Sequence, residues 1–254
     1  MESAPARHAL VTGGGKGIGL AVAASLVRLG VRVSILGREE KSLHAAVAAG
    51  DAQSAIVADV TDPDEVRDAI ARADREAPLD ILVNNAGGVE TGPFLRLDDA
   101  AFERQLALNL MSTVRMTRAV LPGMMERGFG RVINIASTAG LKAYPYVSAY
   151  VAAKHAVVGF TRALALETAK SGVTVNAICP GYTDTDLVRG SIERIRSKSG
   201  GSAADVLAKL VARNPQGRLV RPQEVACVAA WLVSEAAASI NGQAIAVDGG
   251  ETVS

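Results

Sequence analysis

The sequence contains few of the residues that mark a disulfide-stapled, metal-bound or membrane-embedded protein. Its 254 residues include two cysteines, Cys179 and Cys227, and three histidines, so neither a disulfide framework nor a metal-ligand spacing is predicted. No apolar run approaches the roughly 20 residues that a membrane helix requires. The opening MESAPAR is too short for a signal peptide before strand-like sequence begins. We therefore expect a protein of the reducing cytoplasm, without a metal or a membrane partner.

An excess of charge of either sign is also lacking. The 27 lysines and arginines are balanced by 26 aspartates and glutamates, which leaves a formal net charge of +1. This balance provides no basic face for a nucleic acid, so no nucleic-acid partner is expected. Hydrophobic residues make up 49% of the chain, which excludes disorder at this low charge. A chain of this length buries roughly 70–75% of its unfolded surface and needs no staples for a core.

Short apolar runs alternate with helical stretches along the whole chain. The runs lack polar alternation, so both faces of each expected strand should be buried, as in a parallel sheet covered by helices on both sides. The sequence therefore predicts a three-layer α/β fold with seven strands. The expected strands are 8–12, 31–36, 54–58, 80–84, 131–137, 173–179 and 243–247, and the expected helices are 18–29, 64–76, 98–125, 150–170 and 222–235.

One stretch, at about 183–215, departs from this rhythm. It has no strand between two expected core strands, and such an excursion indicates either a functional lid or a disordered loop. No linker separates two halves of the chain elsewhere, so we expect a single domain over 1–254 with a substrate lid at about 183–215. The apolar residues of the stretch fit an apolar pocket or simple helix packing equally well. They are Leu187, Val188, Ile192, Ile195, Leu207 and Leu210.

Five glycines within seven residues follow the first expected strand, in TGGGKGIG (12–19). Glycine lets the backbone turn sharply and approach a ligand closely, and the N-terminus of the next helix suits a pyrophosphate. The spacing is GxxxGxG, which differs from the commonest dinucleotide fingerprint, and Lys16 is followed by Gly17, which excludes a Walker A loop. The turn predicts a dinucleotide site, with a plain glycine-rich turn as the alternative.

The end of the second strand bears on the choice of dinucleotide. In NAD-binding units an acid at this point binds the ribose, but here the strand ends in Leu36-Gly37-Arg38. Arg38 and Lys16 can both meet a 2′-phosphate, and charge-assisted hydrogen bonds contribute about 1.5–3 kcal/mol each. The sequence therefore predicts NADP(H) as the preferred cofactor, with NAD(H) possible. The alternative for Arg38 is a solvated surface arginine.

Tyr150 and Lys154 lie four residues apart in an expected helix, so they share one face. The helix follows a strand that ends at Ser137, and ligands bind at the carboxyl ends of such strands. Reduction of a ketone needs a proton donor. An ammonium about 4 Å from a phenolate stabilises it by about 4 kcal/mol at an effective dielectric near 20. This would lower the pKa of the phenol by roughly three units as an upper bound. Ser137 can bind the substrate oxygen. Asn109 can hold a water that links Lys154 to solvent, with a helix-packing role as the alternative.

Taken together and in order, these motifs resemble the short-chain dehydrogenase/reductase family over nearly the whole chain. The motifs are TGGGKGIG, Asp59-Val60, Asn84-Asn85-Ala86-Gly87, Asn109, Ser137, Tyr150-Val151-Ala152-Ala153-Lys154 and Pro180-Gly181. The resemblance implies a single-domain, Rossmann-like, doubly wound sheet of seven strands. It also implies a homotetramer, with one interface formed by the helices at 98–125 and 150–170.

The resemblance further implies a role for each matched residue. Tyr150 is the implied proton donor, Lys154 its modulator and a ribose ligand, Ser137 the group that orients the substrate, and Asn109 the relay. Asp59 and Val60 are implied to flank the adenine, and Thr183 to reach the carboxamide. The full implied cofactor set is Gly13, Gly15, Lys16, Gly17, Ile18, Gly19, Arg38, Asp59, Val60, Asn85, Ala86, Gly87, Tyr150, Lys154, Pro180, Gly181 and Thr183.

Within the family the chain looks most similar to bacterial 3-oxoacyl-thioester reductases and aromatic polyketide ketoreductases. The insertion SIERIRSKSGGSAADVLAKL (191–210) is longer than in the acyl-carrier reductases, which leaves the carrier open between an acyl carrier protein, coenzyme A and a free hydroxy compound. We predict an NADPH-dependent oxidoreductase that reduces a 3-oxoacyl thioester. One alternative is an NAD-dependent dehydrogenase of a 3-hydroxyacyl-CoA or a cyclic alcohol, and another is a catalytically silent nucleotide-sensing regulator.

Overall fold

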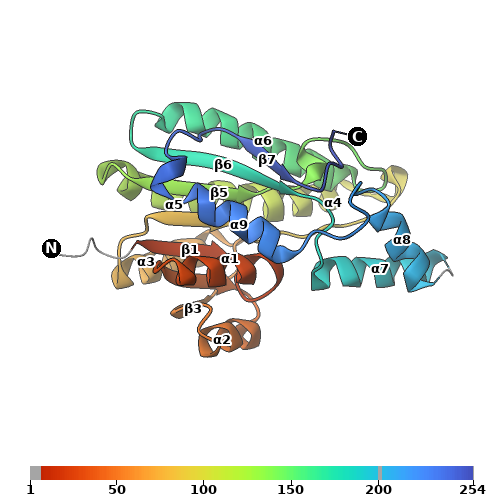
Figure 1. Cartoon of the computed structure of the whole chain (residues 1–254), viewed down its shortest axis with the longest axis horizontal. Helices are drawn as coiled ribbons and strands as arrows, with labels where there is room; N and C mark the ends of the chain where they lie inside the picture. Colours follow the sequence, from red (N-terminus) through yellow and green to blue (C-terminus); the bar gives the residue numbers. More distant parts are fainter. Residues whose placement is uncertain (1–6, 200–201, 254) are drawn as a thin grey trace.

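All seven expected strands form, and they belong to one parallel sheet in the order β3-β2-β1-β4-β5-β6-β7 (Figure 1). The structure, a computed structural model, describes residues 7–199 and 202–253, and the side chains at 194, 195 and 197–199 lie outside this description. The strands are β1 (His8–Thr12), β2 (Arg32–Gly37), β3 (Ser54–Val57), β4 (Ile81–Asn84), β5 (Gly130–Ile135), β6 (Val173–Pro180) and β7 (Ala244–Val247). The predicted three-layer, Rossmann-like, doubly wound fold is confirmed.

Helices cover both faces of this sheet. The α-helices of the described residues are α1 (Gly17–Arg28), α2 (Glu40–Ala48), α3 (Pro63–Glu76), α4 (Asp99–Leu106), α5 (Ser112–Glu126), α6 (Ser148–Thr168), α7 (Asp186–Ser199), α8 (Ala203–Val211) and α9 (Pro222–Leu232). Along β1, Val11 joins the core under α1, α2 and α9, while Leu10 joins the core under α3, α5 and α6, because successive side chains of a strand point to opposite faces. No helix within residues 7–199 and 202–253 is long and apolar enough to cross a membrane.

Three expectations about the helices need correction. The sequence predicts no helix between the second and third strands, yet α2 forms there and buries only Leu43 and Ala46, which is too short an apolar pattern to stand out. The helix expected over 98–125 is divided by a π-helical turn at Ala107–Met111. The helix expected over 18–29 ends one residue earlier, at Arg28, and Leu29 is 59% exposed.

The order of the strands reverses between β1 and β4. From β1 the chain proceeds outward to β2 and β3, and from β4 it proceeds to the other side of the sheet. The loops that follow these two strands therefore diverge, and a crevice opens at their carboxyl ends, which is where ligands bind in open α/β sheets. The glycine turn follows β1 and Ser137 follows β5, so both lie at this edge.

The segment 183–215 contains two helices, α7 and α8, which stand apart from the other helices at one end of the molecule (Figure 1). Helix α8 begins with a capping box, in which Asp205 N–H donates to Ser202 Oγ at 3.1 Å and Ser202 N–H donates to Asp205 Oδ2 at 3.3 Å. A parallel bridge joins Thr183, at the start of the segment, to Val220, just beyond its end. A disordered loop is therefore the wrong description of its described residues.

Candidate active site

A cavity of about 560 Å³ lies at the carboxyl ends of the central strands, within the size range of small-molecule sites. It brings together residues that are far apart in the sequence, from the glycine turn to the start of α7. The predicted residues among its walls are Gly13, Lys16, Gly17, Ile18, Asn85, Ala86, Gly87, Asn109, Ser137, Tyr150, Lys154, Pro180, Gly181 and Thr183. Five others lie beyond these walls: Gly15, Gly19, Arg38, Asp59 and Val60.

The glycine turn has the geometry that only glycine permits. Gly13 and Gly17 have φ values of +64° and +56°, and a Cβ on Gly19 would lie 2.3 Å from the carbonyl oxygen of Gly13. The Asn85 amide holds the turn by donating to the Thr12 carbonyl at 2.9 Å. The described residues provide no side-chain cap for the start of α1, so its first N–H groups are available to an anion.

The two basic residues proposed for the 2′-phosphate each contact a carboxylate. Lys16 Nζ lies 3.0 Å from Glu39 Oε2, and Arg38 lies 3.5 Å from Asp59 Oδ2. The hydrogen bond and charge of Lys16 lower the pKa of Glu39. Burial raises the pKa of Asp59, but hydrogen bonds from Thr61 and the charge of Arg38 outweigh it and lower the pKa overall. Glu39 was not among the residues predicted for the site, and its signal was its place directly after Arg38.

Helix α6 and the end of β5 bring three of the predicted catalytic side chains together. Ser137 follows β5, and its hydroxyl accepts the N–H of Ala139 at 3.1 Å, which fixes its position. Lys154 Nζ donates to the Ile135 carbonyl at 2.9 Å and lies 5.7 Å from the centroid of the Tyr150 ring. The spacing of four residues therefore aligns the tyrosine and the lysine on one wall of the cavity.

Asn109 lies in the π-helical turn between α4 and α5, a local irregularity that is frequent at functional sites. Its amide nitrogen donates to the carbonyls of Gly88 and Gln105 at 3.0 Å, and its oxygen accepts the Gly88 N–H at 3.2 Å. A Cβ on Gly87 would lie 2.8 Å from Asn109 Oδ1 and 3.7 Å from Lys154 Nζ. The bare backbone at Gly87 therefore leaves room for the Asn109 side chain, and Lys154 borders the same space. The alternative role in helix packing fits the bonds of the amide nitrogen.

Burial dominates the electrostatics of this wall. Burial raises the pKa of Tyr150 to about 12, although hydrogen bonding with Ser137 lowers it in part. Burial lowers the pKa of Lys154 to about 8. The expected depression of the phenol pKa by as much as three units is therefore wrong for the free protein. The ammonium is lost near pH 8, so it is no longer present at the pH where the phenol would ionise.

The cavity walls also contain residues that were not predicted from the sequence. Tyr144 and Tyr182 line the cavity, with ring centroids 6.4 Å apart at an interplanar angle of 78°. Three apolar residues of the 183–215 segment also line it: Leu187, Val188 and Leu210. Of the other three apolar residues named there, Ile192 is buried, Leu207 is 37% exposed, and the side chain of Ile195 lies outside the described residues.

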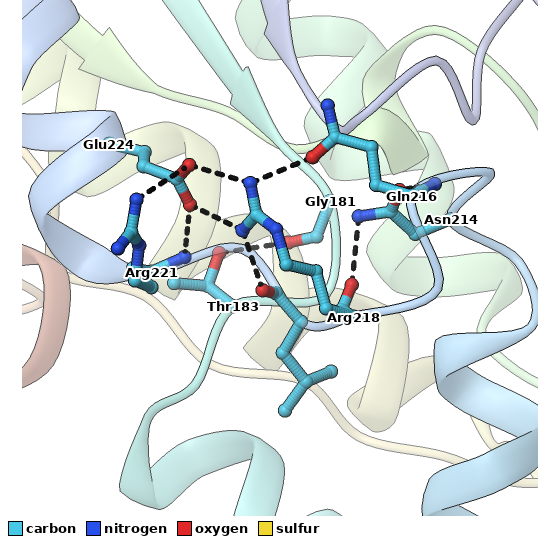
Figure 2. A network of polar contacts seen from close by, with 8 residues as sticks. Gly181, Thr183, Asn214, Gln216, Arg218, Arg221 and Glu224 are labelled. Atoms are coloured by element: carbon cyan, nitrogen blue, oxygen red, sulfur yellow. Dashed lines mark hydrogen bonds and ion pairs between the residues drawn. The ribbon is translucent and has the colours of Figure 1, made fainter.

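Figure 2 shows the polar network that follows the 183–215 segment. Arg218 donates to both carboxylate oxygens of Glu224, at 2.7 and 2.8 Å, and Glu224 also accepts the Arg221 N–H at 2.8 Å. The Asn214 amide donates to the Arg218 carbonyl at 2.8 Å. The hydrogen bond from Arg218 is the largest cause of a Glu224 pKa lowered to about 2. The network ties the end of the segment to the start of α9.

Comparisons with known proteins agree with this geometry. A family model described as short chain dehydrogenase matches residues 7–195. A putative ketoacyl reductase of Streptomyces coelicolor is 38% identical over 257 residues, which cover 98% of both chains. A D-beta-hydroxybutyrate dehydrogenase of Cupriavidus necator is 40% identical over 250 residues, which cover 96% of this chain and 97% of that one.

A solved structure gives the same result. The crystal structure of a single-residue variant of actinorhodin polyketide ketoreductase with NADPH superposes with a TM-score of 0.93 at 38% identity, covering 99% of both chains. The chain therefore belongs to the short-chain dehydrogenase family, as its motifs indicate. It is an oxidoreductase that acts on a hydroxyl or carbonyl group.

Proposed function

We propose that the protein is an NADPH-dependent reductase that converts a 3-oxoacyl thioester to the 3-hydroxyacyl thioester. The observation that carries this proposal is the convergence of a phenol, an ammonium and a hydroxyl on one wall of the cavity, from Tyr150, Lys154 and Ser137. The similarity to a ketoacyl reductase supports the choice of a 3-oxoacyl substrate. The carrier is assigned only as a thioester, either of coenzyme A or of an acyl carrier protein.

The residues present fit a dinucleotide. The glycine turn offers bare backbone at Gly13 and Gly17, and the start of α1 offers N–H groups to a pyrophosphate. We assign Gly15 and Gly19 to the same turn, Asp59 and Val60 to the adenine, and the remaining predicted residues of the cavity to the ribose and nicotinamide. Bound NADPH supplies the hydride for the carbonyl carbon.

The side chains of the wall supply the rest of the chemistry. Ser137 donates a hydrogen bond to the carbonyl oxygen, and Tyr150 donates its proton to that oxygen as the oxygen becomes a hydroxyl. Lys154 stabilises the phenolate that is left. Asn109 holds a water through which a proton returns to the phenolate by way of Lys154.

The two pKa values suit this sequence of events at neutral pH. Tyr150, with a pKa of about 12, keeps the proton that it must donate. Lys154, with a pKa of about 8, is about 90% charged at pH 7, so its ammonium faces the phenolate as soon as it forms. The charge therefore acts on the transient phenolate and leaves the resting phenol protonated.

Lys16 and Arg38 support the preference for NADP(H). Both side chains are exposed, and exposed ion pairs contribute at most about 1 kcal/mol, so a 2′-phosphate can replace the carboxylates of Glu39 and Asp59. Glu39 also favours a second candidate, the oxidation of a 3-hydroxyacyl thioester with NAD. NAD-binding units use an acid after the second strand for the ribose, and Glu39 follows that strand closely.

Three further assignments accompany the proposal. Helices α7 and α8 form a substrate lid at about 183–215, because Leu187, Val188 and Leu210 line the cavity. The protein works in the cytoplasm.

The protein assembles as a homotetramer through α4, α5 and α6. This interface would cover Leu166, which is 81% exposed in the single chain. A solution mass of four chains is the expected measurement, and a monomeric mass would contradict the assembly.

The function is tested with Tyr150→Phe, which removes the donated proton and keeps nearly all of the packing. We expect the oxidation of NADPH by an acetoacetyl thioester, followed at 340 nm, to fall at least 100-fold, with NADPH affinity changed less than about threefold. Tyr146→Phe is the matched control, because Tyr146 is 66% exposed and should tolerate the change. A fully active Tyr150→Phe variant would contradict the mechanism. Wild-type turnover only of 3-hydroxy substrates with NAD would favour the second candidate, and no turnover in either direction would favour the silent regulator.

A further inference from the structure

Tyrosines are concentrated at one place in this protein. Aromatic residues make up 4% of the chain, yet three of its four tyrosines, Tyr144, Tyr150 and Tyr182, line the same cavity. The rings of Tyr144 and Tyr182 meet edge to face, with centroids 6.4 Å apart. This is a preferred geometry between aromatic rings, and a third flat ring can extend it.

The hydroxyl group of Tyr144 is engaged by the protein. It donates to Glu251 Oε1 at 2.7 Å and lies within hydrogen-bond distance of Thr138 Oγ1, at 2.8 Å. Burial and the Glu251 carboxylate raise the pKa of the Tyr144 phenol. Unlike the proton of Tyr150, its proton is already donated to a carboxylate. The Arg213 guanidinium lies 5.3 Å from the ring centroid. A substrate in the cavity therefore meets the ring of Tyr144 and not a free hydroxyl.

Glu251 lies 107 residues after Tyr144, on a turn at residues 248–252 that hydrogen bonds hold in position. Both carboxylate oxygens of Asp248 accept backbone N–H groups of the turn, from Gly250 at 2.9 Å and Thr252 at 2.8 Å. Lys142 Nζ donates to the Glu251 carbonyl at 2.7 Å. Glu251 is 2% exposed. Because the backbone that carries Glu251 is held by these hydrogen bonds, the buried Glu251 carboxylate fixes the position of the Tyr144 ring.

The turn also contacts the base of the segment 183–215. Gly249 packs so closely on Asn214 that a Cβ would lie 2.0 Å from Asn214 Oδ1, and Asn214 belongs to the network of Figure 2. A Cβ on Gly181 would lie 3.3 Å from Glu251 Oε2, so the carboxylate also borders the end of β6. The turn thus contacts Tyr144 and Gly181 of the cavity wall and Asn214 near the end of the segment.

We propose that Tyr144 selects substrates in which the ketone carries a flat, unsaturated ring, and that Glu251 is the positioning residue that holds Tyr144 for this contact. The inference rests on the proposed function. The surroundings agree with a ring of this kind, because Leu187, Val188 and Leu210 add apolar surface to the same cavity. A saturated ring of the same size fills the space but lacks the edge-to-face interaction with Tyr144 and Tyr182.

The test uses three 3-oxoacyl thioesters on one carrier. They differ only in the group on the ketone carbon, which is methyl, cyclohexyl or phenyl. The kcat/KM of NADPH oxidation is measured for each with the wild-type protein, Tyr144→Leu, Glu251→Ala and Glu251→Gln. Tyr146→Leu is the matched control, since Tyr146 is exposed and lies two residues from Tyr144. NADPH affinity and thermal unfolding of every variant show whether it is folded.

We expect the wild type to prefer the phenyl over the cyclohexyl ester by about five- to tenfold in kcat/KM. The preference should fall below about twofold in Tyr144→Leu and Glu251→Ala. The preference for the phenyl ester should be retained in Glu251→Gln, whose amide oxygen still accepts a hydrogen bond from the Tyr144 hydroxyl. It should also be retained in Tyr146→Leu.

Equal use of the phenyl and cyclohexyl esters by the wild type would overturn the inference and leave the proposed function standing. A wild-type preference retained in folded Glu251→Ala would overturn the role of Glu251. Failure to reduce any of the three esters would instead overturn the proposed function itself.

Discussion

The charge of Lys154 is the part of the proposed mechanism that can be given a magnitude from the structure. Its Nζ lies 5.7 Å from the centroid of the Tyr150 ring, and at an effective dielectric near 20 a unit positive charge at that distance stabilises a phenolate by about 3 kcal/mol. This equals about two pKa units, or about 100-fold in rate if the phenolate charge is fully developed in the transition state. Lys154→Met should therefore lower kcat/KM for ketone reduction by about 100-fold.

Titration of the same group gives an independent measurement in the wild type. The pKa of Lys154 is lowered by burial to about 8, so the ammonium is present below that pH and lost above it. The value of kcat/KM should be level from pH 6 to 7.5, fall about tenfold per unit above pH 8, and approach the rate of Lys154→Met near pH 10. Tyr150, with a pKa of about 12, remains protonated over this range and should not contribute to the fall.

The assay follows NADPH at 340 nm, with NADPH saturating at each pH and its affinity measured separately by fluorescence. Lys170→Met, the same change at an exposed site beyond the end of α6, is the control and should follow the wild-type profile. Two results would refute the reasoning: a wild-type profile that stays level to pH 9.5, or a Lys154→Met variant within about threefold of the wild type at pH 7.

Three other predictions address the cofactor site and the network of Figure 2. Arg38→Ala should weaken NADPH binding about tenfold and leave NADH binding unchanged in a fluorescence titration, and equal losses for both cofactors would contradict a contact with the 2′-phosphate. Gly19→Ala should abolish binding of both cofactors or prevent folding, because its Cβ would lie 2.3 Å from the Gly13 carbonyl oxygen, and normal NADPH affinity would contradict that clash. The pKa of Glu224 is lowered to about 2, so the stability it contributes is complete above its ordinary pKa and lost as the pH falls toward 2. The difference in urea midpoint between the wild type and Glu224→Gln should therefore shrink between about pH 5 and 2, and a constant difference would contradict this.

The strands and most of the helices were predictable because their signals are local. Each strand is a compact apolar run with glycine or polar residues at its ends, and Pro63 with the Asp62 cap marks the start of α3. Local signals were insufficient for α2, which buries only two side chains, and for the π-helical turn at Ala107–Met111, which has no distinct composition. In both places packing against neighbouring elements decides the backbone.

The candidate site divides in the same way. The alignment of Tyr150 with Lys154 follows from the helical repeat, and the glycine turn follows from the freedom of the glycine backbone, so both were determined by the sequence itself. The sequence did not determine the direction in which the pKa of Tyr150 shifts, because burial depends on every element that covers the phenol. The bond between Tyr144 and Glu251 spans 107 residues, and only the packing of the C-terminal turn on the loop after β5 brings its two ends together.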